Sequence, residues 1–323
     1  MLLNELFNYL VVNKAAQDSV SGANFYPEDL SKVIYLEGAP PVPFLRRLGS
    51  APVNGSPHTW NEIGLETPTG TSSYFYEGDA PGVTNSAPTP LSNTLFQAGR
   101  AAEVTDKHAA LYAKPGGYQL SSQGKLQWFT DVMGLQMMMR TEELIRELDY
   151  IFINGDKTTT ITASGGRMDV QCDGLLTVLT ENVEDASNAA LTDDMLIDLA
   201  EHIQNQYTGR FPQVLYTTTS QKKTINTWVT NIWFTRTSEL TAGVDVSTFN
   251  TGFFVVSVEI EPYMPLGSCA MVDHTMWKKC DLLPLRAEPL ARTNTSIKRM
   301  ITYYGTLEYG NQRSSGKVHN LNH

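Results

Sequence analysis

Apolar residues recur at helical spacing in one long stretch of the chain, residues 122–153. Seven of them lie three, four or seven residues apart, which places them on one face of an α-helix; they are Leu126, Phe129, Met133, Met137, Leu144, Leu148 and Ile151. Ser121 or Ser122 can cap the start of this helix, and Asn154-Gly155 can end it. The pattern predicts a helix of roughly 40 Å, longer than most globular helices.

The rest of the pattern predicts a mixture of shorter helices and strands. One helix is expected over residues 193–208, capped by Thr192, and another over residues 221–234. Strands are expected where apolar residues alternate or form short runs; these stretches are 212–218, 253–260, 267–273, 281–285 and 298–311. The predicted fold class is therefore α+β.

Two early segments lack the apolar content of a core. Residues 38–58 hold five prolines and three glycines, which predicts an extended arm because proline fixes its own φ and lacks a donor. Residues 59–106 are rich in Gly, Pro, Thr and Ser, with short aromatic pieces that could pair as a long hairpin. Such a hairpin is expected to add little to the core and to need another surface to order it.

Composition narrows the class of protein. Of the 323 residues, 41% are apolar and only 18% are charged, which argues against a disordered acidic chain and against a coiled coil. The net charge of −10 argues against a nucleic-acid reader or a binder of anionic membranes. The longest apolar runs are about six residues, far short of a membrane span. Three widely spaced cysteines fit neither a disulfide framework nor a zinc motif, and favour a reducing compartment.

Charge is unevenly distributed along the chain. Residues 59–106 carry six acids and one arginine, a sum of −5, whereas residues 278–323 carry eight basic residues and three acids, a sum of +5. Complementary patches of this kind favour self-association. The alternative interpretation is that the acidic and the basic segment are two separate faces exposed to solvent.

Motifs for catalysis are missing from the sequence. No His/Cys group has metal-ligand spacing, no GxSxG nucleophile elbow occurs, and NGDKT at 154–158 fits a helix-ending turn better than a phosphate loop. Asp273 and His274 are adjacent, and we expect a surface or loop role for them rather than a catalytic dyad. We therefore expect no enzyme, and no catalytic, cofactor-binding or metal-binding residues.

The order of the predicted elements, with several short motifs, carries a family resemblance. The motifs are Trp60-Asn61-Glu62, Glu77-Gly78, NTLFQ at 93–97, Glu142-Glu143-Leu144, Gly155, Gly174-Leu175, MPLG at 264–267, Asp273-His274, LRAEPL at 285–290 and GTLEY at 305–309. In this order the chain resembles the major capsid proteins of tailed bacteriophages that share the HK97 fold, and most closely the SU10 branch. The resemblance covers nearly the whole chain.

The resemblance implies a division of the chain into the parts of that fold. Residues 1–58 would be the N-terminal arm and 59–108 the E-loop hairpin. Residues 109–174 would form the spine helix and the first part of the P-domain, 175–277 the A-domain, and 278–323 the closing strands of the P-domain. In this fold the E-loop lies across the closing region of an adjacent subunit. The expected inter-subunit contacts are Trp60, Glu66, Tyr74, Phe75, Tyr76, Glu77, Asp79 and Phe96 from the hairpin, with Arg286, Arg292, Lys298 and Arg299 from the closing region.

The implied function is that of a major capsid protein, a structural part of the virion. It would self-assemble into hexamers and pentamers of an icosahedral head, in the host cytoplasm, enclosing double-stranded DNA without reading its sequence. Portal protein is an expected partner, scaffolding and decoration proteins are further candidates, and no cofactor or membrane is expected. Two alternatives stay open: an encapsulin-like nanocompartment shell protein, and a Thr-rich glycan-processing enzyme. Some relatives cross-link a hairpin lysine to a neighbour, but residues 59–106 contain no lysine.

Overall fold

The chain forms two compact units, residues 1–37 with 114–130, and residues 38–113 with 131–323. The computed structural model describes residues 33–35, 40–65, 76–80, 85–112, 118–122, 125–129, 131–158, 160–162, 168–206, 208–228, 246–292 and 294–322. In the first unit, β1 (Val33–Tyr35), β6 (Tyr118–Ser122) and β7 (Lys125–Phe129) form a three-stranded sheet. Strand β1 runs parallel to β6, and β6 runs antiparallel to β7.

The long helix α4 (Val132–Asn154) begins ten residues later than its apolar periodicity predicted. Residues 125–129 form β7 instead, because the sequence Lys-Leu-Gln-Trp-Phe also alternates polar and apolar residues as a strand requires. The cap is Asp131, whose side chain accepts a hydrogen bond from the Gly134 N–H at 2.6 Å. Gly155 ends the helix, as predicted.

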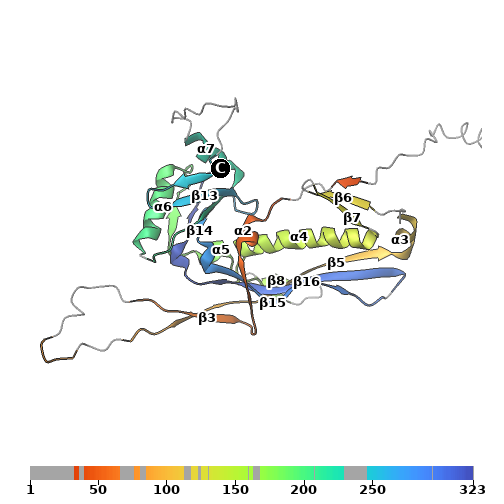
Figure 1. Ribbon diagram of the computed structural model, residues 1–323, viewed down its shortest axis with the longest axis horizontal. Coiled ribbons are helices and arrows are strands. Elements are labelled where there is room, and N and C mark those ends of the chain that lie inside the picture. Colours follow the sequence, from red (N-terminus) through yellow and green to blue (C-terminus); the bar gives the residue numbers. More distant parts are fainter. Residues whose placement is uncertain are drawn as a thin grey trace, which may run out of the picture. The chain divides into compact units, whose positions relative to one another are not determined.

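A four-stranded sheet lies along α4 (Figure 1). Its order is β2 (Gly49–Pro52), β15 (Trp277–Pro289), β16 (Ser296–Tyr309) and β5 (Phe96–Thr105). Strands β15, β16 and β5 are antiparallel to their neighbours, whereas β2 is parallel to β15. Leu148 and Phe152 of α4 are buried in one cluster with Phe96 and Tyr303 of the sheet. The expectation that residues 59–106 form one hairpin is therefore wrong beyond residue 95, since β5 pairs with β16.

A second, six-stranded sheet has both faces covered. Its order is β10 (Val183–Asp185), β17 (Gly316–His319), β14 (Cys269–Val272), β11 (Val214–Thr217), β13 (Val255–Ile260) and β12 (Thr248–Asn250). Along the central strand β11, Val214 and Tyr216 join the cluster that includes α4, whereas Leu215 joins a second cluster with α6 (Asp193–Asn205) and α7 (Thr219–Trp228). Both helices begin close to the predicted positions, and Thr192 caps α6.

The remaining elements are short. The helices are α2 (Pro43–Arg47), α3 (Asp106–Tyr112), α5 (Leu175–Val178) and the 3-10 turns η2 (His274–Met276) and η3 (Gln312–Ser314). Strand β3 (His58–Glu62) pairs antiparallel with β4 (Thr89–Asn93), and β8 (Thr160–Thr162) pairs with β9 (Met168–Val170). None of the helices in these described ranges combines the length and apolarity needed to cross a bilayer.

The end of α4 and the start of α5 approach so closely that two glycines are required. A Cβ atom on Gly155 would lie 2.4 Å from the Cys172 carbonyl oxygen, and one on Gly174 would lie 2.7 Å from the Gly155 nitrogen. The Gly174 N–H donates to the Gly155 carbonyl at 2.9 Å. This contact joins the spine helix to the part of the chain that leads into the six-stranded sheet.

Candidate functional site

The β3–β4 ladder extends away from the four-stranded sheet and is the most prominent projection of the second unit (Figure 1). At its base Trp60 packs edge-on against Tyr309 of β16, with ring centroids 5.1 Å apart, and lies 5.3 Å from the His58 ring. Trp60, predicted to contact a neighbouring subunit, is thus half-buried against its own chain.

Asn93, the last residue of β4, fixes this base to the rest of the molecule. Its side chain is buried and donates to the carbonyls of Asp173, at 3.1 Å, and Leu307, at 2.8 Å. Its oxygen accepts from the N–H groups of Asp173, at 2.8 Å, and Thr94, at 2.9 Å. The amide therefore satisfies four backbone groups from three segments, which sets where the projection leaves the core.

Beyond the ladder the projection exposes large apolar side chains. Leu65 is 98% exposed, Tyr76 85% and Ile63 64%. Glu77 and Asp79, two of the predicted contact residues, are exposed beside Tyr76. The predicted contacts Glu66, Tyr74 and Phe75 lie outside the described residues. Apolar groups this exposed on a thin ladder mark a surface suited to another protein.

Phe96 does not belong with these exposed residues. It is 4% exposed and packs against Phe152 of α4 and Tyr303 of β16, with ring centroids 5.7 and 5.9 Å away. Its predicted role as an inter-subunit contact is corrected to a core role, because β5 lies inside the four-stranded sheet. The expectation that the 59–108 segment adds little to the core fails at Phe96 and at Asn93.

Three of the four predicted basic contacts already have acidic partners in the same chain. Arg292 pairs with Asp106, Lys298 with Glu103 at 3.3 Å, and Arg286 with Glu288 at 2.9 Å. Hydrogen bonds from Ser296 and Lys298 lower the pKa of Glu103. Arg299 is exposed and forms no ion pair with another described residue.

The pairing changes the charge argument drawn from the sequence. Glu103 and Asp106 were counted in the acidic arm, yet they are matched by the closing strands through the β5–β16 ladder. Among the described residues of this segment, the acids without an ion-pair partner are Glu62, Glu77 and Asp79. Complementarity between copies is therefore smaller than the sums −5 and +5 suggest.

The closing segment carries exposed apolar residues that the sequence analysis did not name as contacts. They are Leu282 (43% exposed) and Leu285 (38%) on β15, Leu290 (37%) just after it, and Ile297 (43%) on β16. Their exposure depends on how the strands pair and pack, which the sequence alone could not show. They are apolar groups that a neighbouring copy could cover.

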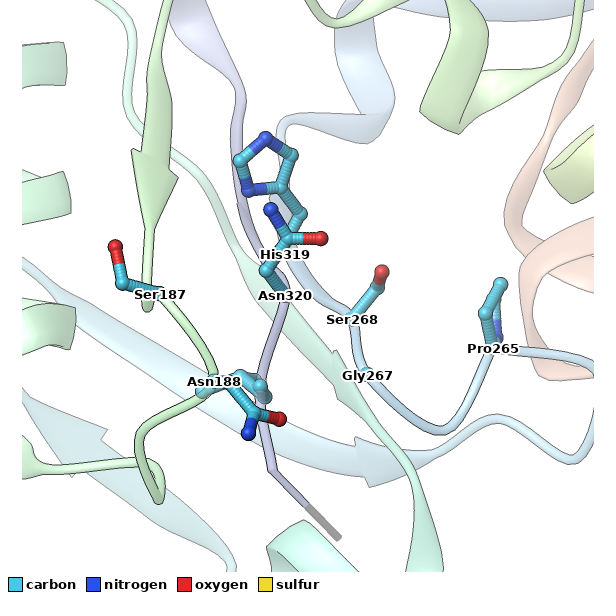
Figure 2. A pocket seen from close by; sticks show the side chains of 8 residues that line it. Ser187, Asn188, Pro265, Gly267, Ser268, His319 and Asn320 are labelled. Atoms are coloured by element: carbon cyan, nitrogen blue, oxygen red, sulfur yellow. The ribbon is translucent and has the colours of Figure 1, made fainter.

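The six-stranded sheet borders an open cavity of about 500 Å³. Ser187, Ser268 and His319 come to it from separate segments, and their polar groups do not converge (Figure 2). Its walls are joined by backbone bonds, from Asn188 N–H to the Asn320 carbonyl at 2.7 Å and from Leu321 N–H to the Gly267 carbonyl at 2.9 Å. No hydrogen bond joins either hydroxyl to the imidazole in this part of the described chain, so the cavity lacks a nucleophile–base pair.

Asp273 and His274 lie in a turn, as expected, but Asp273 is fully buried rather than at the surface. Its carboxylate accepts from Gln213 Nε2 at 2.9 Å and caps η2 through the Thr275 N–H. His274 Nε2 lies 2.7 Å from the Tyr216 hydroxyl, and burial lowers the pKa of His274 to about 4. Both residues hold the turn together, so their chemistry is structural.

Two buried carboxyl groups, Asp149 of α4 and Glu261, meet at the start of α2. Asp149 accepts from the Leu45 N–H at 2.8 Å, and Glu261 accepts from the Phe44 N–H at 3.2 Å. Burial raises the pKa of Asp149 to about 6. Burial, followed by the charge of Asp149, raises that of Glu261 to about 8. Burial therefore shifts both carboxyl groups toward the protonated form in the folded protein.

The comparisons with known proteins identify this arrangement. The family model described as SU10 major capsid protein matches residues 9–322. The chain belongs to the SU10 major capsid protein family. This confirms the resemblance read from the motifs, and no curated protein sequence matches the chain.

Solved structures place this SU10-family protein in the HK97 fold. The capsid of a native GTA particle superposes with a TM-score of 0.63 at 9% identity, covering 93% of this chain and 97% of that one. The capsid of cyanophage P-SCSP1u gives 0.61 at 11% identity, covering 95% and 94%. The SrpI encapsulin of Synechococcus elongatus PCC 7942 gives 0.59 at 13% identity, covering 95% of each chain.

Family and fold together make this chain a bacteriophage major capsid protein, a structural component of the virion. The α+β class and the HK97 fold expected from the sequence are confirmed. A protein of this kind acts through surfaces between copies. The exposed projection and the closing strands are accordingly the candidate functional site.

Proposed function

We propose that the protein forms hexamers and pentamers of an icosahedral head that encloses double-stranded DNA, with the E-loop of one subunit clamped on the closing strands of the next. The observation that carries this proposal is the presence of exposed apolar residues in both segments. Ile63, Leu65 and Tyr76 lie on the projection. In the closing segment, Leu282 and Leu285 lie on β15, Leu290 follows it and Ile297 lies on β16. Burying both sets of residues would gain about 25 cal/mol per Å² of apolar area, and the gain recurs at every copy of the contact.

The parts of the fold are proposed with the sequence-derived boundaries, except at the N-terminal arm and the E-loop. The expectation that residues 38–58 form an extended arm without core content is wrong, because Phe44 of α2 is fully buried and β2 pairs with β15. The arm proposed for 1–58 is therefore shortened, while 109–174 would be the spine helix and first part of the P-domain, 175–277 the A-domain and 278–323 the closing strands. The E-loop of 59–108 divides physically at Asn93. Residues before it project, whereas β5 belongs to the chain's own four-stranded sheet.

Charge adds a smaller term to the proposed clamp. Glu77 and Asp79 near Tyr76, and Arg299 on β16, are exposed without ion-pair partners among the described residues. Exposed pairs contribute at most about 1 kcal/mol and are screened by salt. Their proposed effect is on the rate and register of assembly.

The partners follow from the same proposal. The net charge of −10 suits a shell that encloses DNA without adhering to its phosphates. Assembly would take place in the host cytoplasm, with portal protein, and scaffolding or decoration proteins where the phage supplies them. The protein would catalyse no reaction.

Deleting the tip of the E-loop tests the clamp. Residues 64–87 should be replaced by a short Gly-Ser linker, which keeps Asn93, Phe96 and the β3–β4 ladder. We expect a chain that folds and melts cooperatively but forms no closed shells in negative-stain images. Normal shells from this variant would refute the clamp.

A charge reversal separates the electrostatic term. Glu77→Lys with Asp79→Lys should slow assembly, followed by light scattering, more at low salt than at high salt. The matched control is Glu181→Lys with Glu201→Lys, which changes exposed acids outside the E-loop by the same amount. Equal slowing in both variants would assign the effect to net charge alone.

An encapsulin-like shell remains the second candidate, because an encapsulin is among the solved structures that share the fold. Analysis of particle contents distinguishes the two. Double-stranded DNA inside particles from infected cells supports the phage head, whereas a protein cargo without DNA supports the nanocompartment.

A further inference from the structure

Three side chains of metal-ligand type meet at the base of the E-loop, each from a different strand. They are His58 of β3, Cys280 of β15 and Glu308 of β16. Glu308 Oε2 lies 2.9 Å from His58 Nε2 and 3.1 Å from Cys280 Sγ. The three ligand atoms lie within 4.8 Å of one another. This is the one such group found within the described residues.

The surroundings of the cluster suit an ion. Cys280 is fully buried, whereas the side chains of His58 and Glu308 are 18% and 22% exposed, so the cluster has a closed side and an open side. The open side gives a route for an ion and room for a water ligand.

We propose that His58, Cys280 and Glu308 bind one Zn²⁺ ion, with water as the fourth ligand. A mixed set of imidazole, thiolate and carboxylate is typical of zinc, whereas Ca²⁺ and Mg²⁺ prefer oxygen ligands alone. Zinc bond lengths place tetrahedral ligand atoms about 3.3–3.6 Å apart. The two observed contacts to Glu308, at 2.9 and 3.1 Å, are shorter than this spacing, so ion binding would require rotation of the partly exposed His58 and Glu308 side chains.

Charge and protons balance at the proposed site. Zinc binding displaces the thiol proton of Cys280 to solvent. The bound set is then Zn²⁺ with one thiolate, one carboxylate and one neutral imidazole, and its net charge is zero. No redox step is involved.

The consequence for the molecule is a tether between distant segments of one chain. The ion would join β3 to β15 and β16 at the point where the projection leaves the body (Figure 1). It would act together with Asn93, which fixes the other strand of the ladder through hydrogen bonds. The direction of the E-loop would thus depend on metal.

Zinc titration of the purified full-length chain, after treatment with a chelator, tests the site. We expect calorimetry to show one Zn²⁺ per chain for the wild type and for the control Cys269→Ala, which removes another buried cysteine outside the cluster. Cys280→Ala should bind at least tenfold more weakly. Cobalt added in place of zinc should give the charge-transfer absorption of a cobalt–thiolate bond in the wild type and in the control, but not in Cys280→Ala.

Two variants with substitutions at partly exposed residues keep the test valid if Cys280→Ala prevents folding. His58→Gln and Glu308→Gln alter partly exposed side chains and retain a hydrogen bond between them, yet each should weaken zinc binding at least tenfold. Unchanged zinc binding in these variants, or no stoichiometric binding by the wild type at micromolar zinc, would overturn the proposal. Because binding is measured per chain, the result does not depend on whether the protein assembles into shells.

Discussion

Asn93 shows how much a single polar residue contributes at the junction between a projection and a core. Its amide is buried and satisfies backbone groups of Thr94, Asp173 and Leu307. Removal of the amide leaves several of these groups buried without partners, and each such group costs about 1–3 kcal/mol.

We therefore predict that Asn93→Ala lowers the free energy of unfolding by about 2–4 kcal/mol. Asn61→Ala is the matched control, because Asn61 lies on the paired strand β3 but is exposed, and its effect should stay within about 0.5 kcal/mol. Denaturant unfolding of both variants measures the difference. Equal stability of the two variants would show that Asn93 does not fix the ladder.

Asp149 and Glu261 give the protein a pH-dependent stability of known sign. Both pKa values are raised in the folded state, to about 6 and about 8, so the folded chain binds more protons than the unfolded chain above about pH 4. The contribution of the pair is therefore present at low pH and is lost as the pH rises through the raised values.

We predict that Glu261→Gln gains stability relative to the wild type as the pH rises from about 5 to 8. The comparison with the variant is needed because the lowered pKa of His274 acts in the opposite direction over part of this range. Near pH 8 the Glu261→Gln variant should be more stable than the wild type, because a glutamine side chain cannot ionise. Glu201→Gln, an exposed change, should leave the profile as in the wild type. A Glu261→Gln profile that follows the wild-type slope would exclude the pair as the cause.

At the scale of elements, α4 carries the core through one face. Leu148 is 1% exposed and belongs to the cluster between α4, α5 and both large sheets, whereas Tyr150 on the same helix is 51% exposed. A carboxylate in place of the Leu148 side chain would be buried without a partner, at a cost of several kcal/mol.

We predict that Leu148→Asp yields insoluble or non-cooperatively melting protein, because the cost is a large part of total stability. Tyr150→Asp, the matched change on the exposed face, should remain soluble and melt cooperatively. Calorimetry of the soluble fractions checks both. Cooperative melting of Leu148→Asp near the wild-type temperature would mean that this face is not the core.

The sequence could predict elements where one periodicity dominates and failed where two compete. The helices α4 and α6 follow from apolar spacing and caps, and the exposed position of Glu77 and Asp79 follows from their polar segment. The strand β7 was read as helix, since Leu126 and Phe129 fit both periods. Strand β5 was read as hairpin because its partner β16 lies almost two hundred residues away, beyond any local pattern.

The candidate functional site could not be predicted fully from the sequence for the same reason, because local patterns do not show which distant strands pair. Trp60, expected to contact a neighbour, packs on Tyr309 of its own chain, and Phe96 is in the core because β5 pairs with β16. His58, Cys280 and Glu308 are separated by up to 250 residues, so no spacing rule for metal ligands could join them. Long-range pairing, which sequence periodicity does not encode, decided each of these cases.

At the scale of the whole molecule, the proposed E-loop offers no lysine for a covalent cross-link between subunits. Residues 59–106 contain no lysine, and Lys107 lies in α3 at the base. We predict that mature particles boiled in denaturant run as a monomer near 35.8 kDa on a gel. A ladder of multiples that survives reductant would contradict this, and loss of that ladder in Lys107→Ala would identify the residue responsible.

The strand order has a consequence for synthesis on the ribosome. Strand β16 lies between β15 and β5, so the four-stranded sheet remains incomplete until residues 296–309 have emerged. Strand β17 lies between β10 and β14, so the six-stranded sheet remains incomplete until residues 316–319 have emerged. Non-local pairing of this kind forms late and slowly. A chain that ends before residue 296 therefore lacks the finished four-stranded sheet. Under the proposed clamp such a fragment would offer no complete seat for the E-loop of a neighbour, which would keep translation fragments out of a growing particle.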